Sequence, residues 1–479
     1  MTLAPKNGLL LINPVNPLAL ADIRGRWFNR YRVWKPLGLL TVAALTPPDW
    51  EIRIVDENLG IPDYQSMERP DLVGITAFTS QANRAYELAA QWRRLGVPAV
   101  MGGIHASMCE QEAMRHADSV VVGEAETIWA KVLNDAVRGS LQPRYRADAD
   151  AVAAIPRARH DLLPAGYAFG AVQTTRGCPL NCTFCSVTAF NGARYRHRPI
   201  MDVVDEIAVI DERLLLIVDD NLIGTSAAHI NRAKELFRAM IRANLRKKWI
   251  AQVTINMADD EELLDLAARA GCVGVFIGFE SPTAEGLAEI GKKFNILRGR
   301  DIPASVRRIR RHGILVVGSF IIGLDSDGEG IGRRVADAAS AYGVDLLNAL
   351  FLTPLPGTFL WKKMLAADRI AADSFPHDWQ YYTLTFPVAQ YKQLGPSRIV
   401  WEMECCDRRF YSPWRMASRL LGSLLRMGHP LIALVANLSY RASLPGNHRA
   451  YRRYLRRSGS PPIAAMVAEQ DEEMAAAAI

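Results

Sequence analysis

Short apolar segments alternate with amphipathic segments along most of the chain, and the alternation comes in two separate runs. In the first run the predicted strands cover residues 8–13, 51–56, 71–76, 98–102 and 119–123. The predicted helices between them cover residues 36–45, 81–95, 107–116 and 126–138. Neighbouring parallel strands need a crossover connection, which is usually a helix. The first run therefore predicts an α/β domain built on a doubly wound parallel sheet.

The second run has the same character and is longer. Its predicted strands cover residues 171–175, 214–219, 248–254, 273–279, 314–322 and 346–352. Its predicted helices cover residues 201–212, 227–243, 260–270, 302–312 and 331–342. Six strand–helix units fall short of the eight that close a TIM barrel, so we expect a partial (β/α)6 barrel. In barrels of this type the reactive groups lie at the carboxyl ends of the strands.

The two runs are separated by a stretch with little periodicity, which contains Pro143, Pro156 and Pro164. Prolines without a periodic pattern are typical of a connecting segment. The predicted organisation is a sheet domain over residues 1–140, a linker over 141–170, a barrel over 171–385 and a mostly helical C-terminal region over 386–479. Hydrophobic residues make up 49% of the 479, which is enough for several packed cores.

Three cysteines, Cys178, Cys182 and Cys185, fall within eight residues, directly after the first predicted strand of the second run. Three thiolates can hold three irons of a cubic [4Fe–4S] cluster and leave the fourth iron without a protein ligand. The alternative is a structural zinc site, which usually takes four ligands in two separated pairs. No second pair lies nearby, because Cys109 and Cys272 are isolated. The ligand count therefore favours a cluster with one open iron.

Small or polar residues end the strands of the first run. They are Asn13, Thr76, Gly102, Gly103, Gly123 and Glu124. Ligands of open parallel sheets bind beyond the carboxyl ends of the strands, so these residues predict a binding rim. Paired glycines let a ligand approach the backbone closely. No GxGxxG motif follows the first strand, so NAD is not expected. A purely structural sheet domain is the alternative.

The N-terminus leads into a predicted strand without a secretory signal, and no apolar run reaches the ~18 residues of a membrane span. Seven cysteines, three of them clustered, do not resemble a disulfide framework. These features predict a cytoplasmic protein.

The C-terminal region is unusually basic, with eleven Arg and one acid from residue 407 to residue 457. An amphipathic helix is predicted over residues 414–427, with Arg415, Arg419 and Arg426 on one face. Its opposite face contains Ala417, Leu420, Leu421 and Leu424. This pattern suits a membrane surface, and equally a helix packed on its own domain with a solvated polar face. No nucleic-acid motif accompanies it, so nucleic acid is not an expected partner. The last residues, from about 472, are predicted to be frayed.

The Cys-x3-Cys-x2-Cys loop, with Phe184 directly before its third cysteine, resembles the signature of radical S-adenosylmethionine (SAM) enzymes. Together with the first run, the chain resembles the members that carry an N-terminal cobalamin-binding domain of Rossmann-like type, over about residues 8–385. The resemblance implies that the open iron of a [4Fe–4S] cluster binds SAM, whose reductive cleavage gives a 5′-deoxyadenosyl radical. It also implies a low-potential electron donor such as flavodoxin or ferredoxin.

The resemblance further implies a set of SAM-binding positions. They are Phe184 beside the adenine, then Asp219, Asp220, Asn221, Gln252, Glu280, Ser281, Gly318 and Gly323. Helix capping is the alternative for Asp219 and Asn221. A buried ion pair with an arginine is the alternative for Glu280.

For cobalamin, the resemblance implies the rim residues listed above together with His105. The chain lacks the Asp-x-His-x-x-Gly motif, and residues 56–60 stand in its place, so no histidine of that kind reaches the cobalt. His105 has an ordinary loop residue as its alternative.

An unactivated C–H bond has no usable acidity, so acid–base groups cannot open it, whereas cofactor-borne one-electron chemistry can. The leading prediction is methylation of such a carbon with methylcobalamin as the methyl carrier. An oxidative cyclase or rearrangement enzyme without methyl transfer is the alternative, and a non-catalytic metal-binding scaffold is the alternative from another class. The aromatic residues Trp379, Tyr381, Tyr382, Tyr391 and Trp401, with the basic helix, suggest a bulky apolar or membrane-embedded substrate such as a polyprenyl, hopanoid or tetrapyrrole compound.

Overall fold

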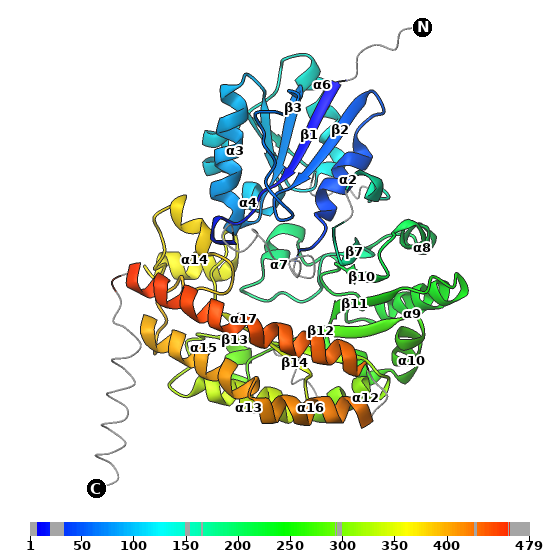
Figure 1. Cartoon of the computed structure of the whole chain (residues 1–479), viewed down its shortest axis with the longest axis vertical. Helices are drawn as coiled ribbons and strands as arrows, with labels where there is room; N and C mark the ends of the chain where they lie inside the picture. The colour runs from blue at the N-terminus through cyan, green and yellow to red at the C-terminus, as the bar shows by residue number, and fades with distance from the viewer. Residues whose placement is uncertain are drawn as a thin grey trace.

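The computed structural model describes residues 7–19, 33–148, 154–163, 166–292, 294, 299–425, 429–457 and 459. The sequence predictions on Pro164, on Arg426 and on the C-terminal tail lie outside these residues. Two parallel sheets, each with helices around it, lie one above the other, and a layer of long helices packs on the second (Figure 1).

The first sheet has six parallel strands in the order β2-β1-β3-β4-β5-β6. They are β1 (Asn7–Asn13), β2 (Trp50–Asp56), β3 (Leu72–Thr76), β4 (Ala99–Gly102), β5 (Ser119–Val122) and β6 (Arg144–Arg146). The helices around them are α2 (Leu37–Leu45), α3 (Ala82–Arg94), α4 (Gly103–Met108), α5 (Glu110–His116) and α6 (Trp129–Val137). The strand order reverses between β1 and β3, and ligands of doubly wound sheets bind at such a switch point.

Alternate residues of β1 explain why this sheet is covered on both faces. Leu10 and Ile12 belong to one hydrophobic core, and Leu9 and Leu11 belong to a second core that includes Trp129 of α6. Successive side chains of a strand point to opposite faces, so a continuous apolar run is buried on both sides. The predicted doubly wound sheet is confirmed.

Two details differ from the sequence predictions. The helix predicted over residues 107–116 is broken at Cys109 into α4 and α5. The short strand β6 pairs with β5 and lies inside the stretch predicted as a linker. At three residues, β6 is too short to show a period-two pattern in the sequence.

The second sheet also has six parallel strands, in the order β14-β13-β12-β11-β10-β7. They are β7 (Phe169–Val172), β10 (Leu214–Ile217), β11 (Lys248–Val253), β12 (Cys272–Glu280), β13 (Leu315–Ile322) and β14 (Leu346–Phe351). The crossover helices are α8 (Ile200–Val209), α9 (Ala227–Arg242), α10 (Glu261–Arg269), α12 (Ile302–Arg311) and α13 (Ile331–Tyr342). The strands follow chain order, and β7 and β14 stay unpaired with each other in the part that the structure describes. The predicted partial barrel is confirmed.

The C-terminal region is mostly helical, as predicted. It contains α15 (Pro396–Phe410), α16 (Pro413–Leu425) and α17 (Pro430–Arg457), whereas α14 (Phe359–Ala366) lies within the range predicted for the barrel. The aromatic residues suggested to mark a substrate surface mostly form a core instead. Trp379, Tyr381 and Tyr382 are each at most 5% exposed, and Trp379 stacks on Phe375 at 3.7 Å between ring centroids.

The orientation of α16 differs from both sequence interpretations. Arg415 donates to Asp337 of α13 at 2.8 Å, and Arg419 donates to Asn437 of α17 at 2.9 Å. The Arg419 guanidinium also lies 3.9 Å from the ring centroid of Phe410, and burial lowers its pKa to about 10. These two arginines therefore face inward, so the solvated polar face expected of a packed helix is not formed by them. The apolar face points outward.

A close contact between α13 and α15 gives a stability prediction. Gly332 donates its backbone N–H to Glu402 at 2.9 Å, and a Cβ there would collide with the carbonyl oxygen of Glu402. Because a backbone atom cannot move aside cheaply, Gly332→Ala is expected to lower the free energy of unfolding by about 3 kcal/mol. Urea denaturation measures this loss. Gly38→Ala is the control, because a Cβ on this residue of α2 would meet no atom within 4 Å; an equal loss in both variants would contradict the prediction.

Candidate active site

The cysteine loop begins at Gly177, a position that only glycine can occupy. The loop lies between β8 (Thr175–Arg176) and α7 (Ser186–Asn191), and β8 pairs with β9 (Arg196–His197). Gly177 has a φ of 87°, and a Cβ there would collide with the carbonyl oxygen of Arg194. Only glycine combines this conformation with this contact.

The three thiols of the loop are free cysteines with limited exposure. Burial raises the pKa of all three, that of Cys182 to about 12; neighbouring cysteines add to the rise at Cys178 and Cys182, and the charge of Asp220 adds to it at Cys185. Among the described residues, no three Cys, His, Asp or Glu side chains converge on one metal position. The thiolates of a cubic cluster each bind a different iron, so they do not need to converge on one position.

The aspartates of the predicted SAM motif hold the start of this loop. Asp219 is fully buried and accepts from the N–H of Thr174 at 2.6 Å and from the hydroxyl of Thr175 at 2.8 Å. Asp220 accepts from the N–H of Gly177 at 2.8 Å. Burial raises the pKa of both carboxyls. Neither aspartate caps a helix, and their contact with SAM stays a prediction.

Asn221, the third residue of that motif, lies beside the cysteines. It is 2% exposed, and its amide nitrogen is 4.0 Å from the sulfur of Cys178 and 3.4 Å from the hydroxyl of Thr254. Amide donors close to cluster sulfurs tune the cluster potential, because they stabilise the reduced, more negative state.

At the end of β12, Glu280 pairs with a lysine and not with the arginine that the sequence suggested. Its carboxylate lies 2.5 Å from the Nζ of Lys292, and the side chains are 9% and 10% exposed. A Cβ on Gly278 would collide with this carboxylate, so the glycine leaves the room that the pair occupies. The predicted binding role of Glu280 and the observed ion pair are compatible.

Sequence reasoning missed Lys292. Burial would lower its pKa, but the charges of Glu280, Cys182 and Cys185 outweigh burial and raise it. The segment containing it follows α11 (Ala284–Glu289), and the carbonyl of Ile290 accepts from the N–H of Thr183 in the cysteine loop at 3.2 Å. The lysine is therefore fixed beside the thiols by a contact 107 residues away in the chain. Nothing in the local sequence indicates this contact.

Replacing Lys292 tests the ion pair. Lys292→Met leaves Glu280 buried without a counter-charge, and the free energy of unfolding is expected to fall by about 3–5 kcal/mol. Chemical denaturation at neutral pH measures the change. Lys131→Met, which breaks a pair with Asp135 in which the lysine is 57% exposed, is the control with an expected loss of about 0.5 kcal/mol. Equal losses in both variants would contradict the role of burial.

The remaining predicted SAM positions differ in what surrounds them. Gln252 is exposed on β11, where alternate residues face away from the helices. Phe184 is half-buried against the core, and Ser281 lies 3.2 Å from the hydroxyl of Thr283. A Cβ on Gly318 would press on Phe279 at 3.2 Å, and one on Gly323 would meet Tyr391 at 2.5 Å. Packing therefore explains both glycines, and only Gln252 is openly available.

The predicted rim residues of the first sheet do lie at one edge. A Cβ on Gly103 would come within 2.6 Å of the Thr76 hydroxyl, and Gly123 donates its N–H to Ser107 at 3.0 Å. Asn13 is 8% exposed and donates to Asp56 at 2.9 Å. Gly102 precedes the N-terminus of α4, which no side chain caps.

His105 and Glu124, both predicted to contact cobalamin, make contacts within the protein. His105 has no exposed surface, and its Nε2 lies 2.8 Å from the hydroxyl of Tyr86. Its place inside α4, not on an open loop, buries the imidazole. Glu124 accepts from Arg176 and Arg196, each at 2.8 Å, and these two charges lower its pKa although burial acts to raise it. The carboxylate therefore joins the end of β5 to the small β8–β9 sheet that precedes and follows the cysteine loop.

The ligand ends of the two sheets face each other. Arg176, the residue before the cysteine loop begins, also pairs with Glu126 at 2.8 Å. On the other side Trp379 donates to Glu112 of α5 at 2.8 Å. Figure 1 shows α4 and α7 in the space between the sheets. The cysteine loop and the rim thus share one region.

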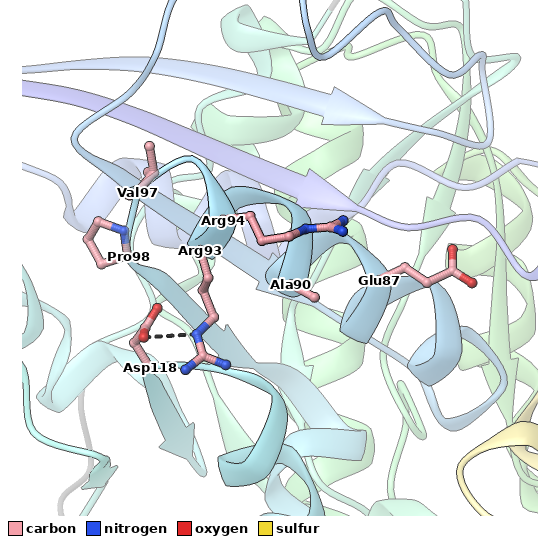
Figure 2. Close-up of a pocket in the computed structure, with 8 residues that line it drawn as sticks. Glu87, Ala90, Arg93, Arg94, Val97, Pro98 and Asp118 are labelled. Carbon is pink, nitrogen blue, oxygen red and sulfur yellow. Dashed lines mark hydrogen bonds and ion pairs between the residues drawn. The ribbon is translucent and has the colours of Figure 1, made fainter.

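A surface depression elsewhere is unrelated to this region. It lies at the end of α3, beside the start of β4, and Figure 2 shows its lining residues. Arg93 donates to Asp118 there at 2.9 Å, and Asp118 also accepts from the N–H of Ala99 at 2.9 Å. Arg93 and Asp118 are thus paired within the fold, at the edge of the sheet opposite to the rim.

Known proteins resemble the chain in both halves. The B12 binding domain profile matches residues 25–133, and the Radical SAM superfamily profile matches residues 172–330. Bacteriochlorophyllide d C-12(1)-methyltransferase of Chlorobaculum tepidum is 28% identical over 81% of this chain and 85% of its own length. Hopanoid C-2 methylase of Rhodopseudomonas palustris is 26% identical over 72% of this chain and 68% of its own length.

Solved structures share the fold. The radical SAM methyltransferase TsrM from Kitasatospora setae, with cobalamin and a [4Fe–4S] cluster bound, has a TM-score of 0.59 and 21% identity, over 77% of this chain and 79% of that one. The cobalamin-dependent radical SAM enzyme OxsB has a TM-score of 0.64 and 13% identity, over 95% and 76%. A radical SAM domain uses a [4Fe–4S] cluster and SAM, and a B12-binding domain holds cobalamin. The chain is therefore a radical SAM protein with an N-terminal B12-binding domain.

Proposed function

We propose that this protein methylates an unactivated carbon, with cobalamin as the methyl carrier. The observation that carries the proposal is the shared region between the sheets: Arg176 and Glu124 hold the cysteine loop next to the predicted cobalamin rim. The two relatives described above are named as methyltransferases, and this supports the same class of reaction here. When bound, the cluster and SAM supply a hydrogen-abstracting radical, and cobalamin supplies the methyl group.

For the cluster, we assign Cys178, Cys182 and Cys185 as ligands. The loop that contains them is held by Asp219 and Asp220 at one end. Thr183 in its middle donates to Ile290 at 3.2 Å. Such outer contacts orient metal ligands, and their loss commonly costs ten- to a hundredfold in metal affinity.

For SAM, we assign the buried pair of Glu280 and Lys292 to the amino acid moiety. A carboxylate accepts from an ammonium group and an ammonium donates to a carboxylate, so the pair matches both charged groups of methionine. Gln252 on the open face of β11 and Asn221 beside Cys178 supply further polar contacts. Phe184 packs near the adenine in this assignment. Gly318 and Gly323 act by packing the strand, and Ser281 by closing the turn after β12.

For cobalamin, we assign the backbone around Gly102, Gly103 and Gly123, with Thr76 and Asn13 at the switch point. Because these glycines have no side chains, a large planar ligand can approach the backbone closely. The residues therefore fit the group. No histidine ligand to cobalt is assigned, because the Asp-x-His-x-x-Gly motif is absent and His105 is buried.

The substrate class and the location are further proposals. We propose a bulky apolar substrate, which is supported by the relatives named for bacteriochlorophyllide and hopanoid and by exposed apolar side chains on α16 and α17. No helix within the described residues is long and apolar enough to cross a membrane. We propose a cytoplasmic enzyme that contacts membranes peripherally. Radical SAM proteins need a reductant such as flavodoxin or ferredoxin, and the donor here is proposed to be of that kind.

An oxidative cyclase is the second candidate. Anaerobic magnesium-protoporphyrin IX monomethyl ester cyclase of Rubrivivax gelatinosus is 23% identical over 72% of this chain and 66% of its own length. That protein also matches most of this chain, so similarity alone does not separate the two reactions.

Product analysis separates them. The protein is reconstituted anaerobically with iron, sulfide and hydroxocobalamin, reduced, and given SAM with candidate apolar substrates. A methyltransferase is expected to form S-adenosylhomocysteine, because SAM remethylates the carrier, together with 5′-deoxyadenosine. Formation of 5′-deoxyadenosine without S-adenosylhomocysteine would overturn methyl transfer and favour the cyclase. Metal analysis that finds one zinc and no iron would overturn both.

A further inference from the structure

Exposed apolar side chains gather on α16 and α17. Seventeen large apolar residues are exposed in the part of the chain that the structure describes, and eight of them lie on these two helices. They are Trp414, Leu421, Leu424, Leu431, Ile432, Leu434, Val435 and Leu438, which we call the hairpin patch. Contiguous apolar surface of this kind marks an interaction site, whereas single exposed leucines are ordinary.

The patch on α16 is one continuous stripe. Trp414, Ala417, Leu421 and Leu424 recur at helical spacing, and all are exposed, Trp414 at 84%. The opposite face of the helix is anchored by the inward arginines, Arg415 on Asp337 among them. An amphipathic helix normally buries its apolar stripe, so this helix is fixed with its apolar stripe in contact with solvent.

The patch continues onto α17 and then becomes basic. Leu431, Val435 and Leu438 share one face of α17, and three further turns along that face lie the exposed Arg449 and Arg453. The opposite face is packed, with Asn437 1% exposed and Tyr451 4% exposed. Figure 1 shows α17 running next to α16 along the lower half of the molecule. One outward surface is thus apolar at the start of α17 and cationic towards its end.

The positive charge around the hairpin patch indicates which kind of partner it binds. No Asp or Glu occurs from residue 408 to residue 457. Arg441, Arg449, Arg453 and Arg456 are exposed, and no acidic partner is present for them among the described residues. Anionic bilayers offer phosphates for arginines and an acyl boundary for leucines at the same surface.

A second copy of this chain fits less well. In a two-fold contact the same surface of both copies meets. Pairing of the two hairpin patches would then bring the arginines of the two α17 helices together, with no acidic residue between them to offset the repulsion. We propose that the hairpin patch and the arginines of α17 bind the surface of an anionic lipid bilayer. The apolar side chains enter the interface, and Arg449 and Arg453 lie at the phosphates. This surface stands apart from the cysteine loop, and the proposal does not depend on the reaction catalysed.

Vesicle sedimentation of the full chain tests the apolar part. The protein is mixed with vesicles of phosphatidylcholine alone or with phosphatidylglycerol added, and binding is expected only to the second. The triple variant Leu421→Ser/Val435→Ser/Leu438→Ser is expected to lose at least about tenfold in partition coefficient. The control is Val137→Ser/Met201→Ser, at side chains 60% and 58% exposed on other helices, with binding unchanged.

Charge reversal tests the basic part. Arg449→Glu/Arg453→Glu is expected to weaken binding by at least about 25-fold, at about fivefold for each lost arginine. Arg94→Glu, an exposed arginine on the first sheet domain, is the control and leaves binding unchanged. Added salt is expected to weaken wild-type binding, because the phosphates are screened.

Several results would overturn the proposal. The first is that wild-type protein stays in the supernatant when anionic vesicles are pelleted. The second is that the triple variant and the charge-reversal variant bind the vesicles as well as wild type does. A third is wild-type protein that sediments as a dimer in solution while the triple variant is a monomer, because the patch then serves self-association. Circular dichroism and thermal unfolding show whether each variant is folded. Vesicle binding uses no cofactor, so its failure is separate from any failure of methyl transfer.

Discussion

Replacement of Cys182 by alanine is expected to abolish iron binding at the cysteine loop and, with it, SAM cleavage. Two thiolates leave two irons of the cube without protein ligands, and even outer contacts of metal ligands are worth ten- to a hundredfold in affinity. A fall of at least about a hundredfold in 5′-deoxyadenosine formation is therefore expected. Iron and sulfide analysis after anaerobic reconstitution, with the absorbance of the cluster, measures the cause directly.

The matched control for this experiment is Cys405→Ser. Cys405 is partly exposed on α15, away from the loop, and carries no role in the proposed chemistry. Its replacement is expected to leave iron content and SAM cleavage at wild-type levels. A Cys182→Ala protein that keeps four irons per chain would contradict the ligand assignment. Thermal unfolding of both variants without metal shows whether the loop change alone destabilises the fold.

Replacement of Gly177 by alanine is expected to have the second largest effect. The new Cβ collides with the carbonyl oxygen of Arg194, and its backbone stays in a left-handed conformation with φ of 87°. Such strain costs about 1–3 kcal/mol, and the collision with backbone adds about 1–3 kcal/mol. Movement of the loop would relieve both the backbone strain and the collision. The hydrogen bond from the N–H of residue 177 to Asp220 is therefore expected to break, and the cluster is expected to be lost.

Gly192→Ala separates conformation from collision. Gly192 follows the same loop with φ of 69°, but a Cβ there has no atom within 4 Å. This variant is expected to lose only about 1 kcal/mol and to keep its iron. Urea denaturation and iron content of the two variants form the comparison. Equal iron content in both would show that the position of Gly177 does not control the cluster.

Much of the fold could be predicted from periodicity alone. The strand that ends at Asn13 and the helix from Ile331 to Tyr342 were predicted almost to the residue, because long, strongly periodic runs leave little choice. Strand β6 and the break at Cys109 were missed, since three residues carry no period and a single turn of irregular helix carries no signal.

The candidate site was predictable only in part. The three cysteines are close in sequence, so their spacing alone indicated shared chemistry. Lys292 is positioned by its contact with Glu280, and Arg176 by its contact with Glu124. No local sequence pattern indicates either partner. The burial of His105 was not predictable from the sequence for a related reason. A histidine after paired glycines looks accessible in the sequence, whereas α4 turns its ring into the interior.

The prediction of which face of α16 is turned outward was wrong. Alternating basic and apolar faces suggested that arginines meet water or lipid. Asp337 and Asn437, contributed by other helices, draw Arg415 and Arg419 inward. Sequence pattern shows that a helix has two different faces, but only its neighbours decide which of the two is turned to the outside.

The link from Glu124 to Arg176 also has a consequence for movement at the cobalamin rim. Glu124 follows Gly123 at the tip of β5, and Arg176 immediately precedes Gly177. A movement of the backbone at Gly123 would be passed through Glu124 to the guanidinium of Arg176 and so to the start of the cysteine loop. Because Arg176 pairs with both Glu124 and Glu126, these ion pairs couple the cobalamin rim to the cysteine loop.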